Sequence, residues 1–109
     1  MAVSFASNRL ITSADMSATF QSDEINLVQK GGFSIHAIFT GSPVGSLYIA
    51  VSINNSDWIV LADSAQAISA AGDVFWNVDS AKYKLARLHY TATSGTGTLN
   101  AFFSTKEVV

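Results

Sequence analysis

The chain has 109 residues, of which 49% are hydrophobic and only 13% are charged, and its formal net charge at neutral pH is −2. This length allows one hydrophobic core but not two, and the net negative charge excludes the dense basic surface that sequence-independent nucleic-acid binding requires. The absence of cysteine excludes disulfides and thiolate metal sites, and no apolar run approaches the about 20 residues that span a bilayer.

The amino-terminal segment, residues 1–13, lacks a clean alternation of apolar and polar side chains. We expect it to form an arm, either reaching a neighbouring subunit or frayed, ahead of a β-sandwich domain at residues 14–109. Two short strand candidates follow at residues 17–21 and 24–28.

The clearest strands are predicted at residues 33–40 and 47–53, where apolar side chains recur at every second position. Residues 41–45 between them contain the only proline and two glycines, a composition typical of a turn. The pattern predicts a hairpin with one buried face. The side chains expected in the core are Phe33, Ile35, Ala37, Phe39, Leu47, Ile49, Val51 and Ile53.

Four further strands are expected in the second half of the chain, at residues 58–62, 74–78, 84–92 and 98–106. The last two are joined by residues 93–97, whose two glycines suggest a second hairpin. The alanine-rich residues 62–71 leave room for a helical turn or two at most. About eight short strands with regular turns predict an all-β fold: one antiparallel β-sandwich with jelly-roll or Greek-key connectivity.

No constellation typical of catalysis is present. The chain has no thiol nucleophile, no Gly-x-Ser-x-Gly elbow and no phosphate-binding glycine loop. His36 and His89 lie in separate predicted strands without the short spacing of a metal site, and the carboxylates fall mainly in turns, where they cap the backbone. We therefore expect a protein that is not an enzyme, with no cofactor and no metal.

The candidate contact residues are Asn54, Asn55, Asp57 and Trp58, because a polar turn followed by a tryptophan can hold a sugar or a partner protein. The competing interpretation places Trp58, like Trp76, in the core.

Arg87 falls on the face of its predicted strand opposite to Ala86, Leu88 and Tyr90. It either marks the solvent face or forms a structural ion pair, for which Asp79 is the expected partner and Asp57 the alternative. So few charges on so small a domain also predict that other protein chains cover part of its surface.

Four segments carry a resemblance to a known family: 45–52 (GSLYIAVS), 57–61 (DWIVL), 75–78 (FWNV) and 87–99 (RLHYTATSGTGTL). Together they resemble the small β-sandwich virion proteins of tailed bacteriophages over residues 41–106. A weaker likeness, through Ser52, the turn at residues 54–57, Trp58 and Arg87, is to discoidin-type carbohydrate-binding sandwiches.

The phage resemblance implies a non-enzymatic structural protein located in the virion. It implies a capsid decoration or cement protein that forms a homo-oligomer, with a trimer expected, and that contacts other virion proteins such as the major capsid protein through loops or the amino-terminal arm. From the net charge we expect no nucleic-acid partner, and from the lack of a long apolar run no membrane partner. The alternative is a glycan- or receptor-binding module of a tail or fibre.

Overall fold

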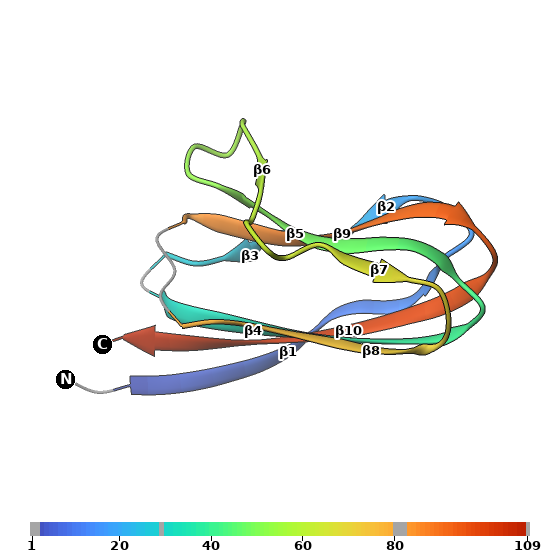
Figure 1. Cartoon of the computed structure of the whole chain (residues 1–109). Coiled ribbons are helices and arrows are strands. Elements are labelled where there is room, and N and C mark those ends of the chain that lie inside the picture. Colours follow the sequence, from blue (N-terminus) through green and yellow to red (C-terminus); the bar gives the residue numbers. More distant parts are fainter. Residues whose placement is uncertain (1–2, 29, 80–82, 109) are drawn as a thin grey trace.

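Two antiparallel sheets face each other in this computed structural model, which describes residues 3–28, 30–79 and 83–108 (Figure 1). The first sheet has the order β1-β10-β4-β8, with β1 at Val3–Asp15, β10 at Gly97–Val108, β4 at Lys30–Gly41 and β8 at Gly72–Val78. The second has the order β2-β9-β5-β6, with β2 at Phe20–Gln21, β9 at Leu85–Ser94, β5 at Val44–Ser52 and β6 at Ile59–Val60. In addition, β3 at Ile25–Asn26 pairs with β9, and β7 at Gln66–Ile68 pairs with β5. The predicted all-β sandwich is confirmed.

The strand order is that of a jelly roll with two interrupted strands. β2 and β3 form one row beside β9, and β6 and β7 form one row beside β5. If each of these pairs is counted as one strand, the fold has eight strands in two sheets of four. The first and last of these strands, β1 and β10, lie side by side. The expected number of about eight strands and the jelly-roll arrangement therefore hold.

The core lies between the sheets and contains the side chains that the alternation predicts, with one exception, together with Ile11 and Ile68 from segments without a clean alternation. Tyr90, Leu88 and Ile35 are completely buried, as are most of their apolar neighbours on the inner faces. Ile53 is instead 74% exposed, because β5 ends at Ser52 and the chain leaves the sheet there. The burial of these apolar side chains is the main favourable contribution to folding.

The two predicted hairpins are wrong, because each pair of strands is divided between the sheets. β4 lies in the first sheet and β5 in the second, and the same holds for β10 and β9. Gly41 and Gly95 bend the chain from one sheet to the other with φ angles of 87° and 79°. The two corners lie side by side (Figure 1), and Ser42 N donates a hydrogen bond to the Thr96 carbonyl at 2.8 Å. The alternation of apolar and polar residues identifies the buried face of a strand. The pattern is the same whether the next strand pairs with it in one sheet or lies in the opposite sheet.

Residues 3–13 belong to the sandwich, since they form most of β1 and pair with β10. The expected boundary between residues 13 and 14 therefore falls inside a strand. The register shifts twice, between Arg9 and Ile11 and between Ile11 and Ala14, and these irregularities explain why the sequence shows no clean alternation. The Asn100 side-chain oxygen accepts hydrogen bonds from Arg9 Nη1 at 3.1 Å and from Ser13 N at 2.9 Å at this irregular stretch. Contact of this segment with a neighbouring subunit stays a prediction.

Two buried serines complete the hydrogen bonding where the second sheet is interrupted. Between β2 and β3, Ser22 Oγ accepts from Leu88 N at 2.9 Å and Ser22 N donates to the Leu88 carbonyl at 2.8 Å. Between β6 and β7, Ser64 Oγ accepts from Ile49 N at 3.1 Å. Each hydroxyl takes the place of a missing strand carbonyl, so that no buried amide is left unpaired at the break.

Candidate functional site

The loop of residues 53–58 between β5 and β6 projects from the outer side of the second sheet (Figure 1). Asn54 braces it: its side-chain oxygen accepts from Ser56 N and Asp57 N, both at 2.9 Å, and its Nδ2 donates to Asp57 Oδ2 at 2.9 Å. Asn55 adopts a left-handed conformation with φ of 71°. The predicted contact residues Asn54 and Asp57 are thus adjacent, and they use their polar atoms to fix the shape of the loop.

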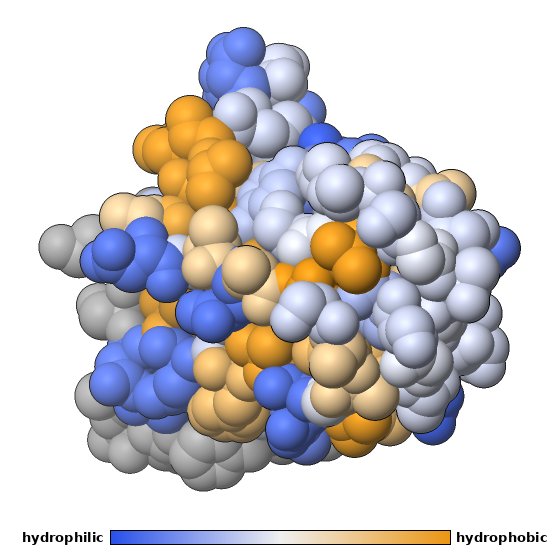
Figure 2. Space-filling view, turned by 45° about the vertical axis from the view of Figure 1, so that its right-hand side comes forward, coloured by the Kyte–Doolittle hydropathy of each residue, from blue (hydrophilic) through white to orange (hydrophobic). Residues whose placement is uncertain are grey.

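Three aliphatic side chains beside this polar tip are exposed, and we call them the apolar flank: Ile53, Ile59 and Val60. Their exposed fractions are 74%, 66% and 55%. Figure 2 shows the projection with a hydrophilic tip and a hydrophobic side below it. Exposed aliphatic side chains held on a braced projection are typical of a protein contact site. The sequence does not indicate this flank, because its pattern predicts strands at these residues and a buried position for Ile53.

A second group, the Arg87 cluster, lies on the outer face of the second sheet and consists of Tyr48, Trp58, Arg87 and His89. The guanidinium carbon of Arg87 lies 3.9 Å from the centroid of the Trp58 ring, and Arg87 Nε donates to His89 Nε2 at 2.9 Å. The His89 ring stacks on Tyr48, with ring centroids 5.1 Å apart and 16° between the planes. Ala50, beside Arg87 in the register, faces outward yet is only 3% exposed. The cluster therefore covers the sheet surface from which the loop departs.

Within the described residues, Arg87 forms no ion pair with either of its two candidate partners. Asp79 follows β8 in the other sheet and accepts from Asn77 Nδ2 at 2.7 Å. Asp57 accepts from Asn54 within the loop. Arg87 instead pairs with an aromatic ring and a histidine, a combination that the charge pattern of the sequence does not indicate.

Partial burial lowers the pKa of His89 below its ordinary value of 6.5, because the charged form loses hydration, and the nearby charge of Arg87 lowers it further. We expect Arg87→Leu to raise this pKa, measured by NMR titration, while Arg9→Leu on the other sheet leaves it unchanged. Because the unfolded chain binds the proton at higher pH, His89 makes stability fall as pH drops below about 6.5 until the folded-state pKa is passed. A His89 pKa equally unaffected by both variants would contradict this electrostatic role of Arg87.

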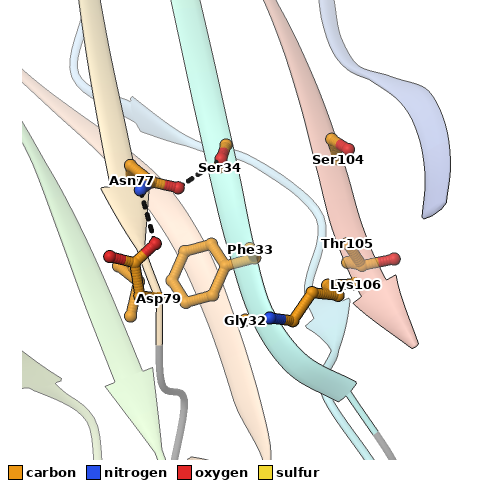
Figure 3. A pocket seen from close by; sticks show the side chains of 9 residues that line it. Gly32, Phe33, Ser34, Asn77, Asp79, Ser104, Thr105 and Lys106 are labelled. Carbon is orange, nitrogen blue, oxygen red and sulfur yellow. Dashed lines mark hydrogen bonds between the residues drawn. The ribbon is translucent and has the colours of Figure 1, made fainter. Parts of the chain in front are cut away.

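The first sheet carries a polar depression of about 310 Å³ (Figure 3). Asn77 bridges its wall, accepting from Ser34 Oγ at 2.8 Å and donating to Asp79 Oδ1 at 2.7 Å. The lining residues are Gly32, Phe33, Ser34, Asn77, Val78, Asp79, Ser104, Thr105 and Lys106. This lining contains no histidine and no adjacent pair of carboxylates for acid–base chemistry. Among the described residues, no three His, Asp or Glu side chains gather as a metal site would require, and no helix is long and apolar enough to cross a membrane.

Solved structures share this fold at low sequence identity. No protein-family model matches the chain, and no curated protein sequence matches it. The SPBc2 prophage-derived protein YomS superposes with a TM-score of 0.62 at 11% identity, covering 95% of this chain and 96% of YomS. The PBSX exported protein XepA gives 0.69 at 15% identity, covering 95% of this chain, which spans only 38% of XepA. The coat protein of Tobacco streak virus gives 0.53 at 5% identity, over 97% of this chain and 86% of that one.

These identities establish the fold alone. They place phage-derived proteins and a virus coat protein among the chains that share it. The resemblance to small phage β-sandwich proteins is thereby confirmed at the level of the fold.

Proposed function

We propose that the chain is a non-enzymatic structural protein of a bacteriophage virion, and that it decorates or cements the capsid. The observation that carries this proposal is the apolar flank, three exposed aliphatic side chains at the two ends of a loop whose shape is fixed by Asn54. The shared fold of phage-derived and coat proteins supports it. The low charged fraction supports it as well, because surfaces that pack on other proteins are depleted of charge at their centres.

The flank supplies an apolar anchor for another virion protein, such as the major capsid protein. Fully burying one isoleucine side chain contributes about 1.5–3 kcal/mol, so two or three of them account for a contact of moderate affinity. A braced loop loses little conformational entropy when it binds. Repeated on a symmetric shell by an oligomer of this chain, moderate contacts add up through avidity.

We expect the double variant Ile53→Ser/Ile59→Ser to bind phage particles about 100-fold more weakly, which corresponds to about 3 kcal/mol. Binding is measured by co-sedimentation with particles of a phage that encodes the chain. The protein is first removed from these particles. Ile38→Ser is the matched control, because Ile38 is also exposed, at 40%, but lies on the other sheet. Unchanged binding by the double variant, or no binding by the wild-type chain, would overturn capsid decoration.

The alternative function, a glycan- or receptor-binding module of a tail or fibre, is favoured by one observation: the Arg87 cluster presents stacked aromatic rings on an outer face. Against it, Arg87 covers one face of Trp58, and Asn54 and Asp57 are hydrogen-bonded within the loop. A glycan array separates the two functions. Decoration requires no sugar binding, whereas binding of a sugar that Trp58→Ala abolishes would establish the alternative.

A further inference from the structure

β8 is an unprotected edge of the first sheet. The sheet order ends at β8, and no other strand of the described residues pairs with its outer side. It pairs with β4 over seven consecutive residues without a register shift, whereas β1, at the opposite edge, is interrupted twice. Half of the backbone amides and carbonyls of an antiparallel edge strand point away from its neighbour. Proteins usually protect such an edge with bulges, proline or lysine, and the sequence of β8, GDVFWNV, contains no proline and no lysine.

The middle residue of this edge strand is also a largely exposed aromatic side chain. Phe75 lies on the outer face with 63% of its surface exposed, and its ring forms an edge-type contact with the His36 ring, with centroids 6.1 Å apart. The single charge on β8, Asp73, is paired with His36 Nε2 at 2.9 Å. Neither residue interrupts the edge, and a large apolar ring at its centre contributes little to the fold of one chain.

We propose that β8 pairs antiparallel with β8 of a second copy of this chain, about a twofold axis at Phe75. In this register all seven residues of β8 find a partner, whereas a shift by two residues in either direction leaves two unpaired. Phe75 then lies opposite its own counterpart, and Asp73 of one copy lies opposite Asn77 of the other. On the inner side, Val74 lies opposite Trp76.

The chemistry of the strand makes this register self-complementary. No two like charges face each other, the two phenylalanine rings meet in a cross-strand pair, and the inner residues extend the hydrophobic layer from one copy to the next. The first sheets of two copies become one eight-stranded sheet. Such a contact is isologous, because the same patch serves both copies. It deepens the proposed function, which requires copies to associate, and it favours an even number of copies over the expected trimer.

Single-cysteine variants test the register directly, because the chain has no cysteine of its own. We expect Phe75→Cys to be cross-linked to its counterpart by a short bis-thiol reagent. Ile38→Cys is the control on the same face: from strand spacing and rise, its counterpart lies about 20 Å away. A mixture of Asp73→Cys and Asn77→Cys should cross-link between variants, whereas each alone should not, because like positions are about 14 Å apart.

The variant Phe75→Lys tests the energetics, since it places two lysines opposite each other at the axis. Light scattering after size exclusion at micromolar concentration should show a dimer for the wild type and for Ile38→Lys. Phe75→Lys should be a monomer, and its circular dichroism spectrum should be that of the wild type. A monomeric wild type, a dimer that survives Phe75→Lys, or cross-linking of Ile38→Cys as efficient as that of Phe75→Cys would each overturn the pairing. A monomeric wild type that still binds phage particles through the apolar flank would overturn the pairing and leave the proposed function standing.

Discussion

Replacing Trp76 by alanine is expected to lower the free energy of unfolding by about 3–5 kcal/mol, the range for deleting a large buried aromatic side chain. Trp76 is only 7% exposed and fills the core beneath β8, and its Nε1 donates to the Ser64 carbonyl at 2.8 Å. The substitution therefore leaves both a cavity and an unpaired buried carbonyl. Urea denaturation followed by far-ultraviolet circular dichroism measures the loss.

The matched control is Trp58→Ala, which removes the same side chain from the outside of the second sheet. Trp58 is half-buried, and the guanidinium of Arg87 lies against its ring. We expect a loss of about 1 kcal/mol, typical of a partly exposed cation–π pair. Equal losses for the two variants would show that the tryptophans do not play the different roles that the structure gives them.

The second large effect is expected for Gly95→Ala, at the corner between β9 and β10. Gly95 has a φ of 79°, where a residue with a Cβ loses about 1–2 kcal/mol. The added methyl group would also overlap the backbone oxygen of Ser42 in the neighbouring corner. Because backbone cannot move aside as a flexible side chain can, we expect a total loss of at least about 3 kcal/mol in the free energy of unfolding.

Gly72→Ala at the start of β8 is the control for this substitution. There the nearest atoms to the new methyl group are those of the Phe39 ring, at 3.8 Å, an ordinary contact. Stability should be unchanged or higher by up to about 1 kcal/mol, because alanine restricts the unfolded chain. Thermal unfolding of both variants under one set of conditions gives the comparison. A Gly95→Ala protein as stable as Gly72→Ala would contradict the close packing of the two corners.

The sequence predicts the class of fold and the inner faces, because both depend on a local pattern. Leu88 and Tyr90 alternate with Arg87 and His89, and the structure buries the first two and exposes part of the others. Partner strands are not local in this sense. The glycines at residues 41 and 95 suit a tight hairpin and a crossing between sheets equally well, so the sequence could not distinguish the two connections.

The candidate contact region stays a prediction. The sequence predicts it at the polar turn and Trp58, and the structure places residues 53–58 in a projecting loop. The sequence does not indicate the apolar flank, because Ile53, Ile59 and Val60 have the composition of a strand and are exposed only because β5 ends early and β6 is short. The sequence also does not predict the contact of Arg87 with Trp58. The two residues come from separate segments of the chain, and residue spacing does not show which segments meet.

The position of β10 has a consequence for the order in which the chain folds during synthesis. β10 is synthesised after the other strands of the sandwich, yet it lies between β1 and β4 in the first sheet. Until β10 emerges, β1 has no strand to pair with. The inner face of the second sheet is then only partly covered by strands of the first sheet. Pairing between strands so distant in sequence is slow. Productive folding is therefore expected after synthesis of β10, and a nascent chain arrested before residue 97 should be as sensitive to protease as an unfolded one.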